Sequence, residues 1–350
     1  RDPIPHARGR LAALSVPILP RTPSMLLEVF LLLLGLVLLV GGGDAIVRGA
    51  SAMAYRLGIS PLVVGLTVVA FGTSMPELMI NSLAALSGNS GLAFGNVIGS
   101  NIANLGLVLG SSALIVPLAI QGQLIIRELP LLLLALAVLL VMTLDGPLRG
   151  EAPLIDASDA LILVLLFCIF LYIAARDIIR QRRDPLVSVI EQLPMASEAD
   201  APSLRRNLLQ VGSGVVLLGL GGKMTIDNGV ALAELMGLST AVIGLVFIAV
   251  GTSLPELVTS VIAAIRKEPD LSVGNVLGSN LFNSLMVLPV GALIAPVEVP
   301  PGGVYDVVVS FLFAAALLPI FVIGKSYMGR AAGMLCILAY VSYLGIRVVV

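Results

Sequence analysis

The sequence has no tryptophan, one histidine and two cysteines among its 350 residues, and only 12% of its residues are charged. A soluble domain carries about 25% charged residues, so the low charge argues against an ordinary soluble fold. Because the only histidine is His6, zinc- or copper-type sites are not expected. Cys168 and Cys336 both lie in apolar runs, and we expect them to be small core residues rather than a disulfide or a metal pair.

Apolar runs take up most of the chain instead, and 58% of the residues are hydrophobic. The runs are roughly 20 residues long, which is the length of helix that crosses about 30 Å of hydrocarbon. A transmembrane β-barrel would show alternation with a period of two, and stretches such as LLLLALAVLLVM (131–142) lack it. The composition therefore predicts an all-α polytopic membrane protein.

The apolar runs divide into ten predicted transmembrane helices. They lie near residues 25–50, 61–86, 92–117, 124–143, 156–177, 208–235, 240–265, 271–295, 304–323 and 328–348. The long polar connection at residues 178–207 separates five spans from five. We therefore expect a first five-helix unit at 25–177 and a second at 208–350.

The distribution of lysine and arginine predicts the orientation in the membrane, because cytoplasmic loops carry the excess of positive charge. The 178–207 loop is rich in arginine: Arg180, Arg182, Arg183, Arg205 and Arg206. The loops on the opposite side contain only Arg149. We expect a multi-pass protein of the inner (plasma) membrane with this loop in the cytoplasm and both termini outside.

Residues 1–24 do not obey this rule, because they carry four arginines and five prolines and would lie outside. We expect them to be a non-native or disordered extension of the working protein. A cleaved signal peptide is not favoured, since the apolar h-region and the cleavage site are missing. N-terminal sequencing of a native product that starts at residue 1 would contradict this expectation.

An internal repeat relates the two halves at an offset of 179 residues. GTSMPEL at 72–78 recurs as GTSLPEL at 251–257, and GNVIGSN at 95–101 recurs as GNVLGSN at 274–280. Residues 65–110 and 244–289 share 21 identities in 46 aligned positions without a gap, counted from the printed sequence. Since five spans is an odd number, the second half enters the membrane from the opposite side. Such inverted-topology repeats are typical of secondary transporters, whose sites lie at the midplane on discontinuous helices.

Each GTSxPEL motif places a proline and a glutamate within a membrane span. Pro76 and Pro255 remove an amide donor, so the carbonyl four residues earlier loses its helical partner. We expect the glycines at 72 and 251 to let the chain unwind there or be approached closely. An ionisable group at mid-membrane costs at least about 2.5 kcal/mol and marks a functional site by default. Glu77 and Glu256 are therefore the leading candidates for function.

The second motif adds amide and hydroxyl oxygens. Ser100 and Asn104 are four residues apart on one helical face, as are Ser279 and Asn283. Together with Thr73, Ser74, Thr252 and Ser253, the candidates form an all-oxygen set. Hard cations such as Ca²⁺, and by extension Na⁺, prefer oxygen ligands, and two carboxylates neutralise one divalent ion.

Purely structural roles compete with function at several of these positions. Gly95, Gly99, Gly274 and Gly278 are equally well explained by helix packing. Taken singly, serine and threonine hydroxyls in membrane helices often bond to their own backbone. Asp44, Lys223 and Asp227 are also intramembrane charges, and for these we favour an ion pair or an interfacial position over a transport role.

The motifs GTSMPEL…GNVIGSNIAN and GTSLPEL…GNVLGSNLFN resemble the two α-repeats of the calcium/cation antiporter superfamily, in particular of the sodium/calcium exchangers. The ten-span layout extends the likeness over residues 25–350. The chain looks like a bacterial-type member, because the large cytoplasmic calcium-sensing domains of animal exchangers are absent. The resemblance implies an antiporter that binds Ca²⁺ and Na⁺ alternately, with spans 1 and 6 sliding past the other helices.

By position, the resemblance also implies a role for each site residue. Glu77 and Glu256 would bridge the calcium site, and Thr73 and Thr252 would add carbonyl oxygens. The carbonyls of Ala70 and Ala249, with Ser74, Ser253, Ser100 and Ser279, would form the outer sodium sites. Asn104 and Asn283 would complete the cluster. No cofactor, nucleic acid or obligate protein partner is implied beyond the two ions and the lipid bilayer.

One departure leaves the coupling open. Members of the family often have an acidic residue at one of the positions filled here by Asn104 and Asn283, so this cluster has two carboxylates and not three. Coupling to H⁺ remains an alternative, as does a cation channel with two half-repeats. An enzyme is not expected, because the chain offers no nucleophile–base pair.

Overall fold

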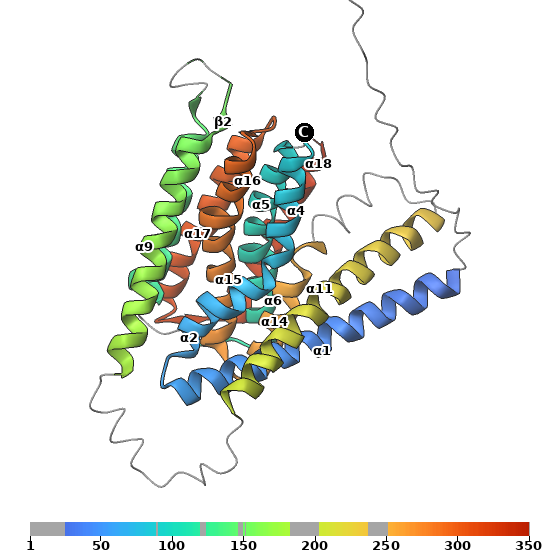
Figure 1. Cartoon of the computed structure of the whole chain (residues 1–350), viewed down its shortest axis with the longest axis vertical. Coiled ribbons are helices and arrows are strands. Elements are labelled where there is room, and N and C mark those ends of the chain that lie inside the picture. Colours follow the sequence, from blue (N-terminus) through green and yellow to red (C-terminus); the bar gives the residue numbers. More distant parts are fainter. Residues whose placement is uncertain are drawn as a thin grey trace, which may run out of the picture.

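The computed structural model describes residues 25–88, 90–119, 124–145, 150, 152–182, 203–236 and 251–349. This part of the chain is a bundle of helices with a long helix pair that leaves the bundle at one side (Figure 1). The residue 1–24 extension, most of the 178–207 loop and the first part of predicted span 7 lie outside the described residues.

The helices of the first half cover its five predicted spans. They are α1 (Met25–Leu57), α2 (Pro61–Val64), η1 (Gly65–Val69), α3 (Ala70–Thr73), α4 (Met75–Leu86), α5 (Ser90–Ala103), η2 (Asn104–Val108), α6 (Leu109–Ile115), η3 (Leu124–Glu128), α7 (Leu129–Met142) and α9 (Ala157–Arg182). The second half contains α11 (Leu204–Leu235), α14 (Leu254–Ile265), α15 (Pro269–Phe282), η6 (Asn283–Val287), α16 (Leu288–Ile294), α17 (Gly303–Ile323) and α18 (Arg330–Val349). The η segments are short π-helices.

Six of the described helices are long and apolar enough to cross a membrane. A seventh candidate is the bent pair Pro61–Thr73 and Met75–Leu86, whose two parts meet at 45°. The remaining predicted spans coincide with η3–α7, α14 and α18. The chain is thus a helical membrane protein, and the count of ten spans stays a prediction.

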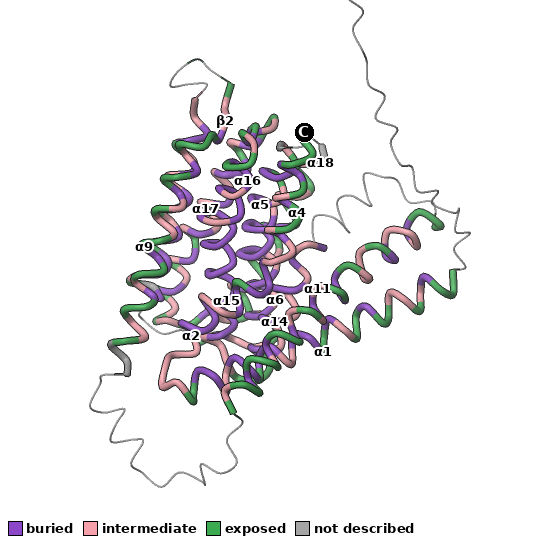
Figure 2. Tube along the Cα trace, viewed as in Figure 1, coloured by how far each residue is buried: buried purple, intermediate pink, exposed green. Residues whose placement is uncertain are grey.

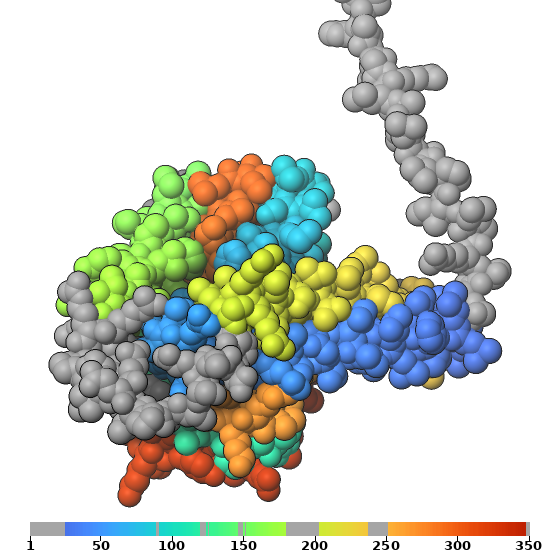
Figure 3. Space-filling model, turned by 60° about the horizontal axis from the view of Figure 1, so that its bottom comes forward, coloured from blue at the N-terminus to red at the C-terminus, as the bar shows by residue number. Residues whose placement is uncertain are grey.

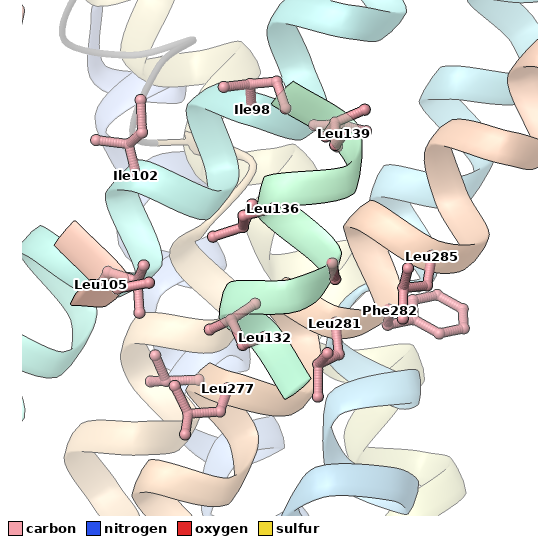
Figure 4. Packing of buried hydrophobic residues seen from close by; sticks show 14 of the residues in the cluster. Ile98, Ile102, Leu105, Leu132, Leu136, Leu139, Leu277, Leu281, Phe282 and Leu285 are labelled. Atoms are coloured by element: carbon pink, nitrogen blue, oxygen red, sulfur yellow. The ribbon is translucent and has the colours of Figure 1, made fainter. Parts of the chain in front are cut away.

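Two helices occupy the centre of the bundle. Every residue of α15 from Leu271 to Phe282 is buried, and α5 is buried along most of its length (Figure 2). Figure 4 shows Leu132, Leu136 and Leu139 of α7 in one apolar cluster with side chains of both central helices. These central helices carry the two GNVxGSN motifs, and the second is buried throughout, whereas Gly95 of the first is exposed.

A second feature is the tight antiparallel pair of α1 and α11, which projects beside the bundle (Figure 3). Glycines recur every seven residues along the contact, at 35, 42 and 49 on α1 and at 214 and 221 on α11. A methyl group placed on Gly42 would lie 2.8 Å from the carbonyl oxygen of Gly214, and one on Gly35 would lie 2.8 Å from the amide nitrogen of Thr225. Only glycine permits backbones to approach this closely.

Two small antiparallel sheets connect the halves of the chain. β1 (Leu118–Ala119) pairs with β4 (Tyr327–Met328), and β2 (Leu154–Ile155) pairs with β3 (Val297–Glu298). Each sheet therefore takes one strand from each half. Leu118 and Val297 are 179 residues apart, so the repeat offset found in the sequence recurs in these strands.

The structure corrects one expectation and specifies another. Cys168 is exposed on α9, so it is not a core residue, whereas Cys336 is buried and both are free. Asp44 and Lys223 do form ion pairs, although not with each other. Asp44 contacts Arg48 and also Arg266 at the end of α14, and Lys223 contacts Asp227 at 2.8 Å.

We predict that Gly42→Ala destabilises the protein by about 1–3 kcal/mol, because the added methyl group meets backbone atoms that cannot rotate away. Thermal unfolding of the purified protein in detergent measures the effect. Gly41→Ala is the matched control, since Gly41 has nothing within 4 Å of the added carbon. An equal loss of stability in both variants would contradict the tight contact.

Candidate functional site

The centre of the bundle brings together two broken helices, one from each half. At Ser74 the backbone leaves α-helical geometry (φ −88°, ψ 7°), and Ser253 has nearly the same angles (φ −89°, ψ 6°). A new helix starts after each break with Pro76 or Pro255 in its first turn. Glu77 and Glu256 follow directly, in the first turn of α4 and α14, where the helix dipole favours a negative charge.

Both glutamates are fully buried, and their carboxylates are only partly satisfied. Glu256 Oε1 accepts hydrogen bonds from Ser74 at 2.9 Å and from Ser279 at 3.4 Å. Within the described part of the chain, Glu256 Oε2 and both oxygens of Glu77 have no hydrogen-bond partner. Three of the four carboxylate oxygens are thus buried without a donor, which is unfavourable unless a cation compensates them.

Hydroxyl groups join the broken helices to the central helices at two equivalent points. Thr73 Oγ1 lies 3.4 Å from Ser279 Oγ, and Thr252 Oγ1 lies 3.3 Å from Ser100 Oγ. The repeat offset relates these two contacts to each other. The Ser100 contact therefore places α5 beside the second broken helix, and the Ser279 contact places α15 beside the first.

Asn104 and Asn283 each start a π-helical segment, η2 and η6, one turn beyond these serines. η2 contacts α14, and η6 contacts α4. Asn104 therefore lies on the side of Glu256, and Asn283 on the side of Glu77. Both asparagines are fully buried, and neither side-chain oxygen has a hydrogen-bond partner among the described residues. π-helical segments inside α-helices are frequent at functional sites.

Eleven of the twelve predicted site residues fall in the described part of the chain, and Ala249 lies outside it. The carbonyl of Ala70 accepts the amide of Ser74 at 3.0 Å and the hydroxyl of Thr73 at 3.3 Å. Ser253, unlike Ser74, has no hydrogen-bond partner for its hydroxyl within the described residues. The structure thus distinguishes the two halves where the motifs do not.

Of the two alternatives expected for the glycines of the GTSxPEL motifs, unwinding or close approach, the structure shows close approach. The break falls at the serines, and Gly72 lies within α3. A side chain on Gly72 would approach Val215 of α11 to 2.7 Å, and one on Gly251 would approach Ile226 to the same distance. These glycines allow close contact with α11 rather than local unwinding.

In the second half, the glycines of the GNVLGSN motif lie in close contact with a neighbouring helix. A methyl group on Gly274 would lie 2.7 Å from the carbonyl oxygen of Leu62, and one on Gly278 would lie 2.6 Å from that of Leu66. The equivalent neighbours of Gly95 and Gly99 belong to residues 241–249, outside the described residues.

Sequence reasoning missed several polar side chains around the candidate ligands. Asn275 accepts a hydrogen bond from Thr73 at 3.1 Å and donates one to Ser260 at 2.9 Å. Asn96 makes the equivalent bond to Asn81, also at 2.9 Å. The signal was present, because these positions repeat in register, but the sequence does not say which asparagines face a ligand and which face each other.

The candidate ligand atoms suit a hard cation. They are carboxylate, amide and hydroxyl oxygens, which Ca²⁺ and similar ions prefer. In the described part of the chain, no group of three or more histidine, cysteine, aspartate or glutamate side chains is arranged so that it could hold a metal ion. With only two carboxylates, the site balances about two positive charges.

Comparison with known proteins places this geometry in a family. The model of the family described as sodium/calcium exchanger protein matches residues 27–176 and 207–349. A putative antiporter, CaxA of Alkalimonas amylolytica, is 37% identical over 324 residues, which cover 91% of this chain and 98% of CaxA. The inner membrane protein YrbG of Escherichia coli K12 is 38% identical over 280 residues, 79% of this chain and 83% of YrbG.

A solved structure of the sodium-calcium exchanger NCX_Mj, from a crystal soaked with 10 mM Na⁺ and no Ca²⁺, has the same fold. The TM-score is 0.76 at 30% sequence identity, and the match covers 92% of this chain and 99% of that one.

The unpaired buried carboxylates predict an effect of cations on stability. Ca²⁺ should raise the melting temperature of the purified protein, because a ligand that binds only the folded state stabilises it. In cation-free buffer, Glu77→Gln should melt no lower than the native protein, since it removes an uncompensated buried charge, and Ca²⁺ should no longer stabilise it. Exposed Glu234 provides the control Glu234→Gln. A Ca²⁺ response that persists in Glu77→Gln would show that this carboxylate does not bind the ion.

Proposed function

The chain belongs to the sodium/calcium exchanger family, and from that premise we propose that it is a secondary antiporter exchanging Na⁺ for Ca²⁺ across the membrane. The exchange occurs by alternating access and includes no chemical step. Its substrates are the two ions, and its surroundings are the lipid bilayer.

The observation that carries this proposal is the pair of buried glutamates with three unpartnered oxygens. A structural role for a buried carboxylate calls for a donor or a positive partner, and in the described residues only Glu256 Oε1 has a donor. A cation between the two broken helices satisfies all three free oxygens at once. Since the charge of two carboxylates matches one Ca²⁺ or two Na⁺, the same cage accepts the ions in alternation.

We assign roles to the predicted site residues on this basis. Glu77 and Glu256 bridge Ca²⁺, with carbonyl oxygens of Thr73 and Thr252 on either side. The hydroxyls of Ser74, Ser253, Ser100 and Ser279 and the carbonyls of Ala70 and Ala249 form the outer Na⁺ sites. Asn104 and Asn283 complete the cluster with their amide oxygens. The contacts Thr73–Ser279 and Thr252–Ser100 support this assignment, because they bring these groups together from four segments.

The topology proposed for this function is two inverted five-helix repeats, residues 25–177 and 208–350, joined by the cytoplasmic 178–207 loop. Matching features 179 residues apart support it: the breaks at Ser74 and Ser253, and the π-helices that start at Asn104 and Asn283. The family model also matches each half separately. Both termini then lie outside the inner (plasma) membrane.

Coupling to H⁺ is the competing proposal, because asparagine fills both the 104 and 283 positions and the site has no third carboxylate. A channel is less favoured, since ten of the eleven described candidate ligands are buried between packed helices, Thr252 being the exception.

We predict that proteoliposomes loaded with Na⁺ and diluted into Na⁺-free buffer take up ⁴⁵Ca²⁺, and that Glu77→Gln and Glu256→Gln abolish this uptake. Each substitution removes half of the negative charge that compensates the ion. Vesicles with only a pH gradient serve as the comparison.

The possible results separate the alternatives. Uptake driven only by the pH gradient would replace Na⁺ by H⁺ as the coupling ion. Uptake that needs no counter-ion and does not saturate would indicate a channel. Full uptake in either glutamine variant would remove the proposed role of that carboxylate.

A further inference from the structure

Two asparagines near the proposed ligands were not among the predicted site residues, although both are fully buried: Asn101 on α5 and Asn280 on α15. They occupy equivalent positions in the two repeats, 179 residues apart. Their hydrogen bonds differ, and the difference reaches the proposed ligand Asn104.

The side-chain amide of Asn104 donates to Oδ1 of Asn280 at 3.0 Å. The amide of Asn280 donates in turn to the main-chain carbonyl of Asn101 at 3.2 Å. These two hydrogen bonds hold the NH₂ group of the Asn104 side chain toward Asn280, so its oxygen points away from Asn280. The NH₂ group is used by Asn280, and the oxygen has no partner among the described residues.

Such an arrangement matters for a cation site. An asparagine side chain carries an acceptor oxygen and a donor NH₂ group on the same carbon, and only the oxygen binds a cation. If the amide rotates by half a turn, the NH₂ group faces the ion and repels it. Groups that hydrogen-bond to a ligand residue typically contribute 10–100-fold to metal affinity or activity.

The equivalent bond is missing in the other half. There, Asn283 would donate to Oδ1 of Asn101, but neither polar atom of the Asn283 side chain has a partner in the described part, and Asn101 Oδ1 has none either. The Asn101 amide instead donates to Ser284 Oγ at 2.8 Å. Ser284 stands at the position where the first half has Leu105, which offers no hydrogen bond. One polar substitution therefore breaks the symmetry.

We propose that Asn280 is a positioning residue that holds the Asn104 amide with its oxygen toward the transported cation, and that Asn101 has no such role for Asn283. This inference rests on the proposed function, since Asn104 is a ligand only if the cluster binds the ion. It makes the two repeats unequal in the site: the first supplies an amide ligand fixed in advance, and the second supplies one whose orientation no hydrogen bond fixes among the described residues.

The test compares Asn280→Ala with its matched control, Asn101→Ala, in Na⁺-driven ⁴⁵Ca²⁺ uptake. We expect Asn280→Ala to raise the KM for Ca²⁺ about 10-fold with a much smaller change in the maximal rate. Asn101→Ala removes the same atoms at the equivalent buried position, and we expect its KM to stay within about twofold of the native value. Equal increases in both variants would overturn the proposal.

A double substitution tests whether Asn280 acts through Asn104. If it does, Asn104→Ala/Asn280→Ala has the same KM as Asn104→Ala alone, because the group that Asn280 orients is already gone. Multiplied effects would indicate an independent, structural contribution of Asn280 and would contradict the proposal.

Asn280→Asp covers the case in which Asn280→Ala does not fold. Its carboxylate still accepts the Asn104 amide, although it no longer donates to the Asn101 carbonyl, so we expect a KM well below that of Asn104→Ala. The added negative charge does not by itself weaken Ca²⁺ binding, so a KM as high as that of Asn104→Ala would refute the inference. Failure of the proposed function is distinguishable, because it appears as absent Na⁺-driven uptake in the native protein. In that case the Ca²⁺-induced rise in melting temperature of the same variants still tests the positioning role.

Discussion

The burial of two carboxylates, with three oxygens lacking hydrogen-bond donors in the described structure, is the constraint on which the rest of the site depends. An uncompensated buried charge is among the most unfavourable features a fold can contain. The helix breaks at Ser74 and Ser253 moderate it, since each places a glutamate in the first turn of a new helix, where the dipole is favourable. In the proposed function, the remaining imbalance is the driving force for binding a cation, so the feature that weakens the empty fold is the one that selects the substrate.

The central helices α5 and α15 are closely packed around the two glutamates, whereas the α1–α11 pair contacts the bundle through few polar groups. α15 is buried on all sides and α5 on most, so the asparagines and serines they carry are held by close packing. α1 and α11 instead pack mainly against each other through glycine-lined backbone contact (Figure 3). The ion pair of Asp44 with Arg266 is a contact between this helix pair and the end of α14. The two helices of this pair are therefore held to each other along their length more closely than either is held to the bundle.

Much of this arrangement could be predicted from the sequence, and the limits have identifiable causes. The repeat offset, the glutamates and the oxygen-only chemistry follow from motifs that recur in register, because a charge inside an apolar span is costly and is rarely kept without a function. The burial of Cys168 was misjudged, and the motif left open whether Gly72 serves unwinding or close contact, because a sequence shows which residue is small or apolar but not which neighbour it faces. The bonds from Asn104 to Asn280 and from Asn101 to Ser284 join residues far apart in the chain. The two halves differ in these bonds because Ser284 stands where the first half has Leu105. The sequence alone does not show that Ser284 faces Asn101, since that contact forms only when the helices pack.

The two strand pairs have a consequence for how the protein is made. β1 is synthesised early, yet its partner β4 lies between the last two helices, and β2 likewise waits for β3. Neither small sheet can form until most of the second half has left the ribosome and entered the membrane. Such long-range pairing is slow to form and leaves strand edges open in the meantime. The two sheets therefore form late, after most of the second half has folded. A chain truncated before β4 would leave β1 as an unpaired strand.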